Sequence, residues 1–288
     1  MLSLIAVLVC QAASAARSTA PPSSSPPGVV LSVSVERRVE YVRYHFTDAS
    51  SFDTTALVPH FFEQRYDASN TWISVAADYR LAGAAARTEV ALTPRVTTAG
   101  SDLDTFFDPS GDVIVSGTDG LVSLGSVALS ERLGITTWRG WTLGVTVGYR
   151  RSRADFPPDV VIVTHTLPPS TTRTLTSDPE TTISQVVESG FIGDARWRLG
   201  GAWHLSVSLD ALPITRAGLT VSLPGKYPGD DTTAAAYAFG ARGQLAIERA
   251  FRRVTAGVGV AFGGAWSYES LSAYGTHAAG LTVYVRTN

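Results

Sequence analysis

Cysteine, lysine and long apolar runs are nearly missing from this 288-residue chain. The single cysteine, Cys10, rules out an internal disulfide framework. Lys226 is the single lysine, and the formal net charge of -2 gives no basic footprint, which argues against nucleic acid as a partner. Apart from the partly apolar start, no window holds the roughly 18 consecutive apolar residues of a membrane-spanning helix. The chain must therefore build its fold, and any membrane contact, from shorter elements.

The first residues predict export. Residues 2–9 form a short apolar core, and Ala13-Ser14-Ala15 fits the small-residue pattern of a cleavage site. We therefore predict a signal peptide over residues 1–15, cleaved after Ala15. Residues 16–28 are rich in proline and serine and read as a linker, which leaves residues 29–288 as one domain.

The clearest pattern in the chain is a two-faced hairpin over residues 181–212. Apolar and polar residues alternate on both sides of Gly200 and Gly201, and a period of two predicts strands joined by a tight glycine turn. One face carries Trp197 and Trp203 near the turn, and the other face carries charges of both signs. A soluble sheet shows the same alternation, so the hairpin alone does not decide which solvent its apolar face meets.

Eight further runs of strand character accompany the hairpin, which makes ten strands. The connections alternate in length: short links fall near residues 82–86, 136–140, 200–202 and 249–253, whereas long ones fall near 48–70, 98–120, 154–180, 213–232 and 269–276. An even number of strands with short turns at one end and long loops at the other is typical of transmembrane barrels. The predicted runs outside the hairpin are 29–47, 71–81, 87–96, 121–135, 141–153, 233–248, 254–268 and 277–286.

The six tryptophans fit the same pattern because they gather at strand ends. Trp138, Trp141, Trp197 and Trp203 lie beside short turns, and Trp72 and Trp266 lie beside long loops. An aromatic girdle at each membrane interface predicts this distribution, whereas a soluble sandwich more often places tryptophan in mid-strand.

In these features the chain resembles Gram-negative outer-membrane β-barrel proteins over residues 29–288. The resemblance implies an all-β fold, a closed antiparallel transmembrane β-barrel of about ten strands. It also implies short periplasmic turns, long extracellular loops and pairing of the first strand with the last, because lipid cannot satisfy an open sheet edge. The expected partners are outer-membrane lipid, lipopolysaccharide and the barrel-assembly machinery, with no cofactor. The sequence names no extracellular ligand.

Charged residues on the face opposite the apolar one should point into the lumen. Opposite charges in a narrow lumen pair with each other, because an unpaired buried charge costs several kcal/mol. The simplest interpretation is a network of salt bridges and water that holds the wall in shape; the alternative is a selective pore whose excess of arginine favours anions. The predicted lumen residues are Asp78, Arg80, Arg87, Glu89, Arg95, Arg150, Glu188, Asp194, Arg196, Arg198, Asp210, Arg242 and Glu248.

Asp102 and Asp104, in the second long loop, are the candidate catalytic residues. Paired carboxylates can activate water or hold a cation, and they invite comparison with omptins, ten-stranded surface proteases of similar length. Omptins also use an Asp/His pair, and none of the five histidines (His45, His60, His165, His204 and His277) stands in an Asp-x-His sequence. Ordinary turn chemistry is therefore the competing explanation for the two aspartates, and the sequence predicts no metal site.

Two other loop features carry hypotheses. The apolar runs 113–115 and 160–163 are expected to extend strands above the bilayer as hairpins that pack on each other. Further aspartates, Asp159 among them, suggest calcium bridging to lipopolysaccharide phosphates, although the second loop lacks the spacing of an EF-hand.

The sequence therefore predicts a non-enzymatic outer-membrane barrel that binds at its surface or passes small solutes. The alternative from another class is an omptin-like surface hydrolase with divergent active-site residues.

Overall fold

The computed structural model describes residues 28–47, 52–53, 58–107, 112–167, 169–222, 232–268 and 272–287, with the side chains of 52–53, 58–60 and 232 left out. The predicted signal peptide and nearly all of the linker lie outside this range. No helix among the described residues is long and apolar enough to cross a membrane. The strands are β1 (Val30–Phe46), β2 (Phe52–Asp53), β3 (Val58–Leu81), β4 (Ala84–Phe107), β5 (Asp112–Trp138), β6 (Trp141–Phe156), β7 (Val160–His165), β8 (Thr171–Thr176), β9 (Glu180–Gly200), β10 (Trp203–Ser222), β11 (Thr232–Ala250), β12 (Val254–Ser267) and β13 (Ser272–Thr287).

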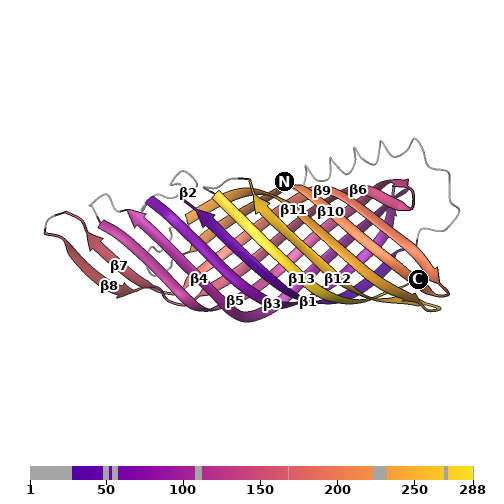
Figure 1. Ribbon diagram of the computed structural model, residues 1–288, viewed down its shortest axis with the longest axis horizontal. Coiled ribbons are helices and arrows are strands. Elements are labelled where there is room, and N and C mark those ends of the chain that lie inside the picture. Colours follow the sequence, from indigo (N-terminus) through magenta and orange to yellow (C-terminus); the bar gives the residue numbers. More distant parts are fainter. Residues whose placement is uncertain are drawn as a thin grey trace.

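Ten of these strands close an antiparallel barrel (Figure 1). Neighbours around the wall are β1, β3, β4, β5, β6, β9, β10, β11, β12 and β13, and β13 returns to pair with β1 from Ser32↔Arg286 to Phe46↔Ser272. The predicted pairing of first and last strands is thereby confirmed. Closure leaves no open edge in the wall, as a lipid environment requires. The remaining strands are additions: β2 pairs with β11, and the β7–β8 hairpin pairs with β5.

The short turns have the backbone conformation of tight hairpins. Ala82-Gly83 and Arg139-Gly140 both have positive φ at each position, and Gly200 and Gly201 do so in the hairpin predicted from the sequence. Two consecutive residues with positive φ match the right-handed twist of the flanking strands, which is why glycine recurs there. These turns lie together at the end of the barrel opposite to β7 and β8 (Figure 1).

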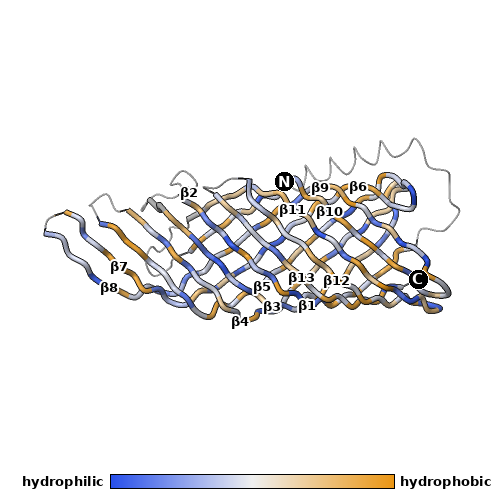
Figure 2. Tube along the Cα trace, in the orientation of Figure 1, coloured by the Kyte–Doolittle hydropathy of each residue, from blue (hydrophilic) through white to orange (hydrophobic). Residues whose placement is uncertain are grey.

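The outer wall of the barrel is apolar. Along much of the wall, alternate residues are exposed apolar side chains, such as Val33 and Val35 on β1, Val75 on β3 and Val258 on β12. Figure 2 shows this as alternating hydropathic colours along the strands. Exposed apolar residues over so much of a surface indicate that lipid, and not water, covers it.

Two β-bulges switch the face to which side chains point. Thr93 pairs with Ser126 and Val96 with Leu124, so β4 carries one extra residue at Pro94–Arg95. The same shift occurs on β10 between Leu212 and Thr215, at Pro213. Before the first bulge the odd-numbered residues of β4 face inward, and after it the even-numbered ones do. Proline suits these positions because it cannot donate to the ladder.

Most strands run further outward than the sequence suggested. Residues 98–107, 112–120 and 213–222, expected in long loops, continue β4, β5 and β10. These stretches lack a continuous apolar–polar alternation, because the bulges reverse which residues face inward and the inward residues include both apolar and polar side chains. The predicted extension of the runs 113–115 and 160–163 is confirmed, since Val115 pairs with Ile162 between β5 and β7.

An apolar core occupies the outer end of the lumen. Four of its six aromatic members, Tyr44, Phe46, Phe156 and Tyr274, are at most 2% exposed, and all ten wall strands contribute if the partly buried Val96 is counted. Tyr274 adjoins Gly275, which pairs with Trp266, so the core lies at and above the outer tryptophan level. The lumen is therefore polar below this level, and apolar side chains pack across it at and above this level. The core comprises Val42, Tyr44, Phe46, Phe62, Tyr66, Ala68, Val122, Leu124, Ala154, Phe156, Val186, Ala217, Leu219, Val221, Ala234, Ala236, Ala238, Ala265 and Tyr274.

Candidate functional site

Below the apolar core, ion pairs line the lumen. Several join strands that are not neighbours in the wall. Arg132 of β5 reaches Asp194 of β9 at 2.9 Å and Asp210 of β10 at 2.8 Å. Further pairs are Arg38 with Glu36 (2.8 Å), Arg87 with Asp78 (3.2 Å) and Glu89 (3.1 Å), Arg196 with Glu248 (2.6 Å), Arg286 with Glu248 (3.1 Å), and Arg242 with Glu188 (2.9 Å) and Asp210 (3.3 Å). Bridges of this kind brace the wall from inside.

The uppermost bridge meets the apolar core. Arg150 on β6 forms an ion pair with Glu40 on β1, and its Nη2 donates a hydrogen bond of 2.7 Å to the hydroxyl of Tyr274. One guanidinium therefore links the charged lumen to the apolar core beside it. The planar, multi-donor guanidinium suits this junction, because it can serve a carboxylate and a hydroxyl at once.

Three of the charged residues predicted for the lumen lie elsewhere. The predicted lumen position of Arg95 is wrong. Its side chain is 60% exposed and pairs with Asp155 at 3.1 Å on the outer wall. The extra residue in β4 reverses its direction. Arg80 and Arg198 lie at the turn rim, where they donate hydrogen bonds to the carbonyls of Gly83 and Gly201.

The prediction that Trp72 belongs to the aromatic girdle is also wrong, because Trp72 lies inside the barrel and is 4% exposed. The guanidinium of Arg38 stacks over its ring at 5.1 Å. On β3 the residue next to it, Ile73, belongs to the exposed apolar set, so Trp72 has the opposite parity. Trp138, Trp197, Trp203 and Trp266 are exposed, and Trp141 packs edge to face on Trp197.

The lumen also holds charges that sequence reasoning missed: Glu36, Arg38, Glu40, Arg132 and Arg286. The sequence does contain a pattern for Glu36, Arg38 and Glu40, since they occupy alternate positions of β1. Arg37 and Arg43 disguised it, because these arginines face outward and break the expected apolar stripe.

Two cavities remain among these charges. One of about 720 Å³ is lined by Val30, Gly140 and Thr287, which lie at the turn end of the barrel. The other, of about 250 Å³, is lined by Glu40, Arg150 and Trp72 and ends below the apolar core. Glu36, Glu89 and Arg132 line both cavities. The two cavities thus share part of their lining, and the larger one reaches the turn end of the barrel.

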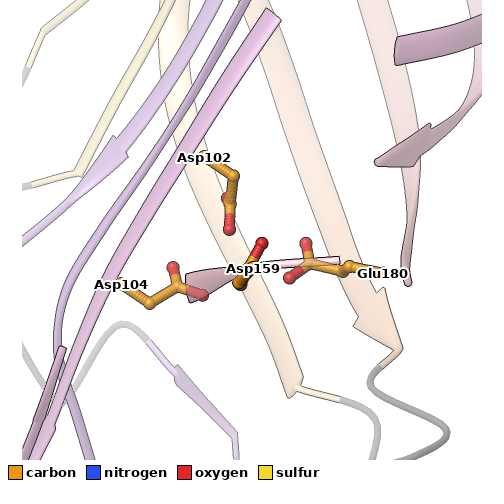
Figure 3. A group of neighbouring side chains, drawn as sticks. All are labelled: Asp102, Asp104, Asp159 and Glu180. Atoms are coloured by element: carbon orange, nitrogen blue, oxygen red, sulfur yellow. The ribbon is translucent and has the colours of Figure 1, made fainter. Parts of the chain in front are cut away.

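The second candidate site lies at the outer end, where four carboxylates converge (Figure 3). One oxygen from each of Asp102, Asp104, Asp159 and Glu180 lies within 4.8 Å of the others, and each residue is 1–2% exposed. In Figure 3, Asp102 and Asp104 extend from one strand toward Asp159 and Glu180, which come from separate segments. We call this group the acidic cluster. The sequence pointed to its first two members and did not bring the other two to them.

Local backbone features build the acidic cluster. The bulge at Pro94 turns Asp102 and Asp104 inward and leaves Leu103, between them, 44% exposed on the outer wall. Asp159 follows Pro157 and Pro158, where the chain leaves β6 and begins β7. Glu180 opens β9 opposite Phe156. Two strand ends and one bulge therefore bring together residues that span 78 positions of the sequence.

Hydrogen bonds fix parts of this cluster. Ser116 donates to Asp159 Oδ2 at 2.6 Å, and the backbone of Asp159 is held by Ser177. Gln64, fully buried and opposite Asp102 on β3, donates its amide to Glu180. Gln64 Oε1 and Asp159 Oδ1 are buried and have no hydrogen-bond partner among the described residues.

The electrostatics of the acidic cluster oppose full ionisation. Burial is the largest cause that raises the pKa of Asp102 well above its ordinary value. The negative charges of Asp104 and Glu180 act in the same direction, and Asp159 adds to them. Carboxylates this close must share protons or a cation, because like charges in a dry site repel strongly.

The histidines of the hydrolase hypothesis do not reach these aspartates in the described part of the chain. His165 lies on β7 with its Nδ1 2.5 Å from Asp112. Asp112 stands six positions beyond Thr118, the partner of Asp102 on β5, which is about 20 Å along a strand. His45 pairs with Glu63 at 3.1 Å, and the side chain of His60 lies outside the described residues.

Solved structures of other proteins share this architecture. The outer-membrane protease OmpT of Escherichia coli matches with a TM-score of 0.57 at 9% identity, covering 94% of this chain and all of that one. The fold is that of a ten-stranded outer-membrane β-barrel. The translocator domain of the autotransporter NalP from Neisseria meningitidis (TM-score 0.35, 10% identity, 100% and 95% covered) and the toluene transporter TodX of Pseudomonas putida (0.26, 7%, 91% and 89%) match more weakly. No family model and no curated protein matches the chain.

Proposed function

We propose that this protein is an exported outer-membrane barrel whose lumen is closed to solutes and whose extracellular end is a binding surface. The observation that carries the proposal is the apolar core across the outer end of the lumen. Water and ions pass a channel only where its lining replaces their hydration, and tightly packed aromatic and aliphatic side chains do not. The cavities lie beside the ion pairs, and the larger one reaches the turn end. Water that enters there can solvate the charges, so their presence in the lumen does not require a conduction path.

The strands that rise above the bilayer support a role at the surface. β4, β5 and the β7–β8 hairpin form one continuous sheet beyond the apolar core, and all six residues of β8 are exposed. Rigid strands present a fixed surface to an extracellular partner with little loss of conformational entropy on binding.

The hydrolase alternative has less support. A polypeptide substrate must reach the reacting groups, and the four carboxylates are 1–2% exposed. His45 and His165 are held by other carboxylates, Glu63 and Asp112, so they do not supply a base beside Asp102.

Proteoliposomes test the proposal. Barrels refolded into liposomes are assayed for swelling in small sugars and for cleavage of a mixed fluorogenic peptide library. We expect neither swelling nor cleavage. Swelling at the level of an open channel contradicts the proposal, and cleavage that is lost in Asp102→Asn favours the hydrolase instead.

A further inference from the structure

The acidic cluster has the dimensions of a calcium coordination shell. Calcium binds six to eight oxygens at about 2.3–2.6 Å, so oxygens on opposite sides of one ion lie about 4.6–5.2 Å apart. The four carboxylate oxygens lie within 4.8 Å of one another. Some point between them therefore lies within about 2.9 Å of all four oxygens, so side-chain shifts of a few tenths of an ångström bring each to calcium-bonding distance.

A second observation is independent of the carboxylates. Gln64 is fully buried, its amide reaches Glu180, and its Oε1 lacks a hydrogen-bond partner among the described residues. A buried amide oxygen without a donor is costly, and amide oxygens are ordinary calcium ligands. Asp159 is held by Ser116 through Oδ2, which leaves Oδ1 as a buried acceptor in the same place.

We propose that Asp102, Asp104, Asp159 and Glu180, with Gln64, form a buried calcium site that fastens the start of β7 and of β9 to β4. No backbone ladder joins β4 directly to the start of β7 or of β9, because β4 pairs with β3 and β5. One ion would therefore join separate segments at the outer end, as the arginines join separate strands lower in the lumen. This site is distinct from bridging of lipopolysaccharide phosphates by exposed loops, since its ligands are buried inside the barrel.

Calcium fits better than magnesium. Magnesium requires near-octahedral oxygens at about 2.0–2.1 Å and retains several waters, whereas calcium accepts many protein oxygens in irregular geometry. A dry cluster with four carboxylates and an amide offers protein oxygens and little space for water. The extracellular end of the barrel also faces a medium from which calcium can be drawn.

The test uses the purified full-length barrel refolded in detergent. Calcium and magnesium are titrated by calorimetry after chelator treatment, and unfolding is followed by heat-modifiable gel migration. We expect one calcium per barrel, binding at least about tenfold tighter than magnesium, and an unfolding midpoint that calcium raises and chelator lowers. Failure to bind, equal affinity for both ions, or a midpoint that follows pH while ignoring calcium contradicts the site.

Two variants locate the binding. Asp159→Asn removes one ligand charge and is expected to weaken calcium binding about tenfold or more, while it stabilises the calcium-free barrel by relieving repulsion. Asp119→Asn removes an exposed charge from β5, outside the cluster, and serves as the matched control that leaves both properties unchanged. Equal loss in the two variants indicates diffuse surface binding and overturns the proposal. Solute exclusion does not depend on the ion, so this result stands apart from the test of the closed lumen.

Discussion

Arg150 and Glu40 form an ion pair across the lumen, joining β6 to β1, which three other strands separate along the shorter path around the wall. The carboxylate side chain is 6% exposed and the guanidinium 19%. Such a pair braces distant parts of a closed sheet, and Tyr274, which accepts a hydrogen bond from Arg150, belongs to the apolar core.

Breaking this ion pair from one side should destabilise the barrel strongly. Arg150→Met leaves Glu40 buried without its cation, at a cost of about 3–5 kcal/mol. The double variant Arg150→Met/Glu40→Gln should recover much of the loss because no uncompensated charge remains. Urea unfolding followed by tryptophan fluorescence measures both. Arg80→Met, at the exposed turn rim, is the control; an equal effect there would remove the special role of Arg150.

The bulge at Pro94 predicts which residues of β4 reagents can reach. Continuing the alternation from Thr93 without a bulge points Leu103 inward, whereas the structure places it on the outer wall. In a background in which Cys10 is absent, Leu103→Cys should react rapidly with a maleimide in detergent-free liposomes, and Thr98→Cys should be protected. The opposite pattern of labelling would show that β4 runs without the bulge.

Tryptophan position can be checked by quenching with brominated lipid. Trp266 is 49% exposed on the wall, whereas Trp72 lies beneath Arg38 inside the barrel. We expect Trp266→Phe to lower the quenchable fraction of the fluorescence and Trp72→Phe to raise it, since the latter removes an emitter that lipid does not reach. Equal changes would place both rings at the same depth relative to lipid.

Asp155, on the outer wall beside the exposed Arg95 and Arg153, makes the stability of the barrel depend on pH. Partial burial opposes its ionisation, but hydrogen bonds from Arg153 and Thr181 and the charges of Arg153 and Arg95 lower its pKa below the ordinary value. A lowered folded-state pKa contributes stability above the unfolded value, about 3.9, and this contribution is lost as the pH falls through the folded value. The wild-type barrel should thus lose more stability than Asp155→Asn between about pH 5 and pH 3. Parallel pH profiles of the two proteins would contradict this.

The fold was predictable because its signals are local. Alternation around Gly200 and Gly201 gives a hairpin directly, and the same pattern elsewhere gives the strand count. The positions of Arg95 and Trp72 were not predicted, because an error of one residue in parity moves a side chain to the other face. Pro94 and Pro213 marked the two bulges, yet a proline inside a strand signals a break without saying in which direction the next residues turn.

Only two of the four carboxylates of the acidic cluster could be brought together from the sequence. Asp102 and Asp104 are neighbours on one strand, so their spacing shows in the sequence. Asp159 and Glu180 join them through a strand junction and the curvature of a closed wall. No local pattern encodes that proximity, because it depends on the register of strands on either side of β5.

The conductance of the reconstituted barrel in a planar bilayer tests the closed lumen most directly. Wild-type protein should insert without conducting. The variant Tyr44→Ala/Phe156→Ala, which removes two of the largest fully buried side chains of the apolar core, should open steps of current. Steps of equal size from the wild type and the variant would contradict the account, because they would show that the apolar core does not seal the barrel.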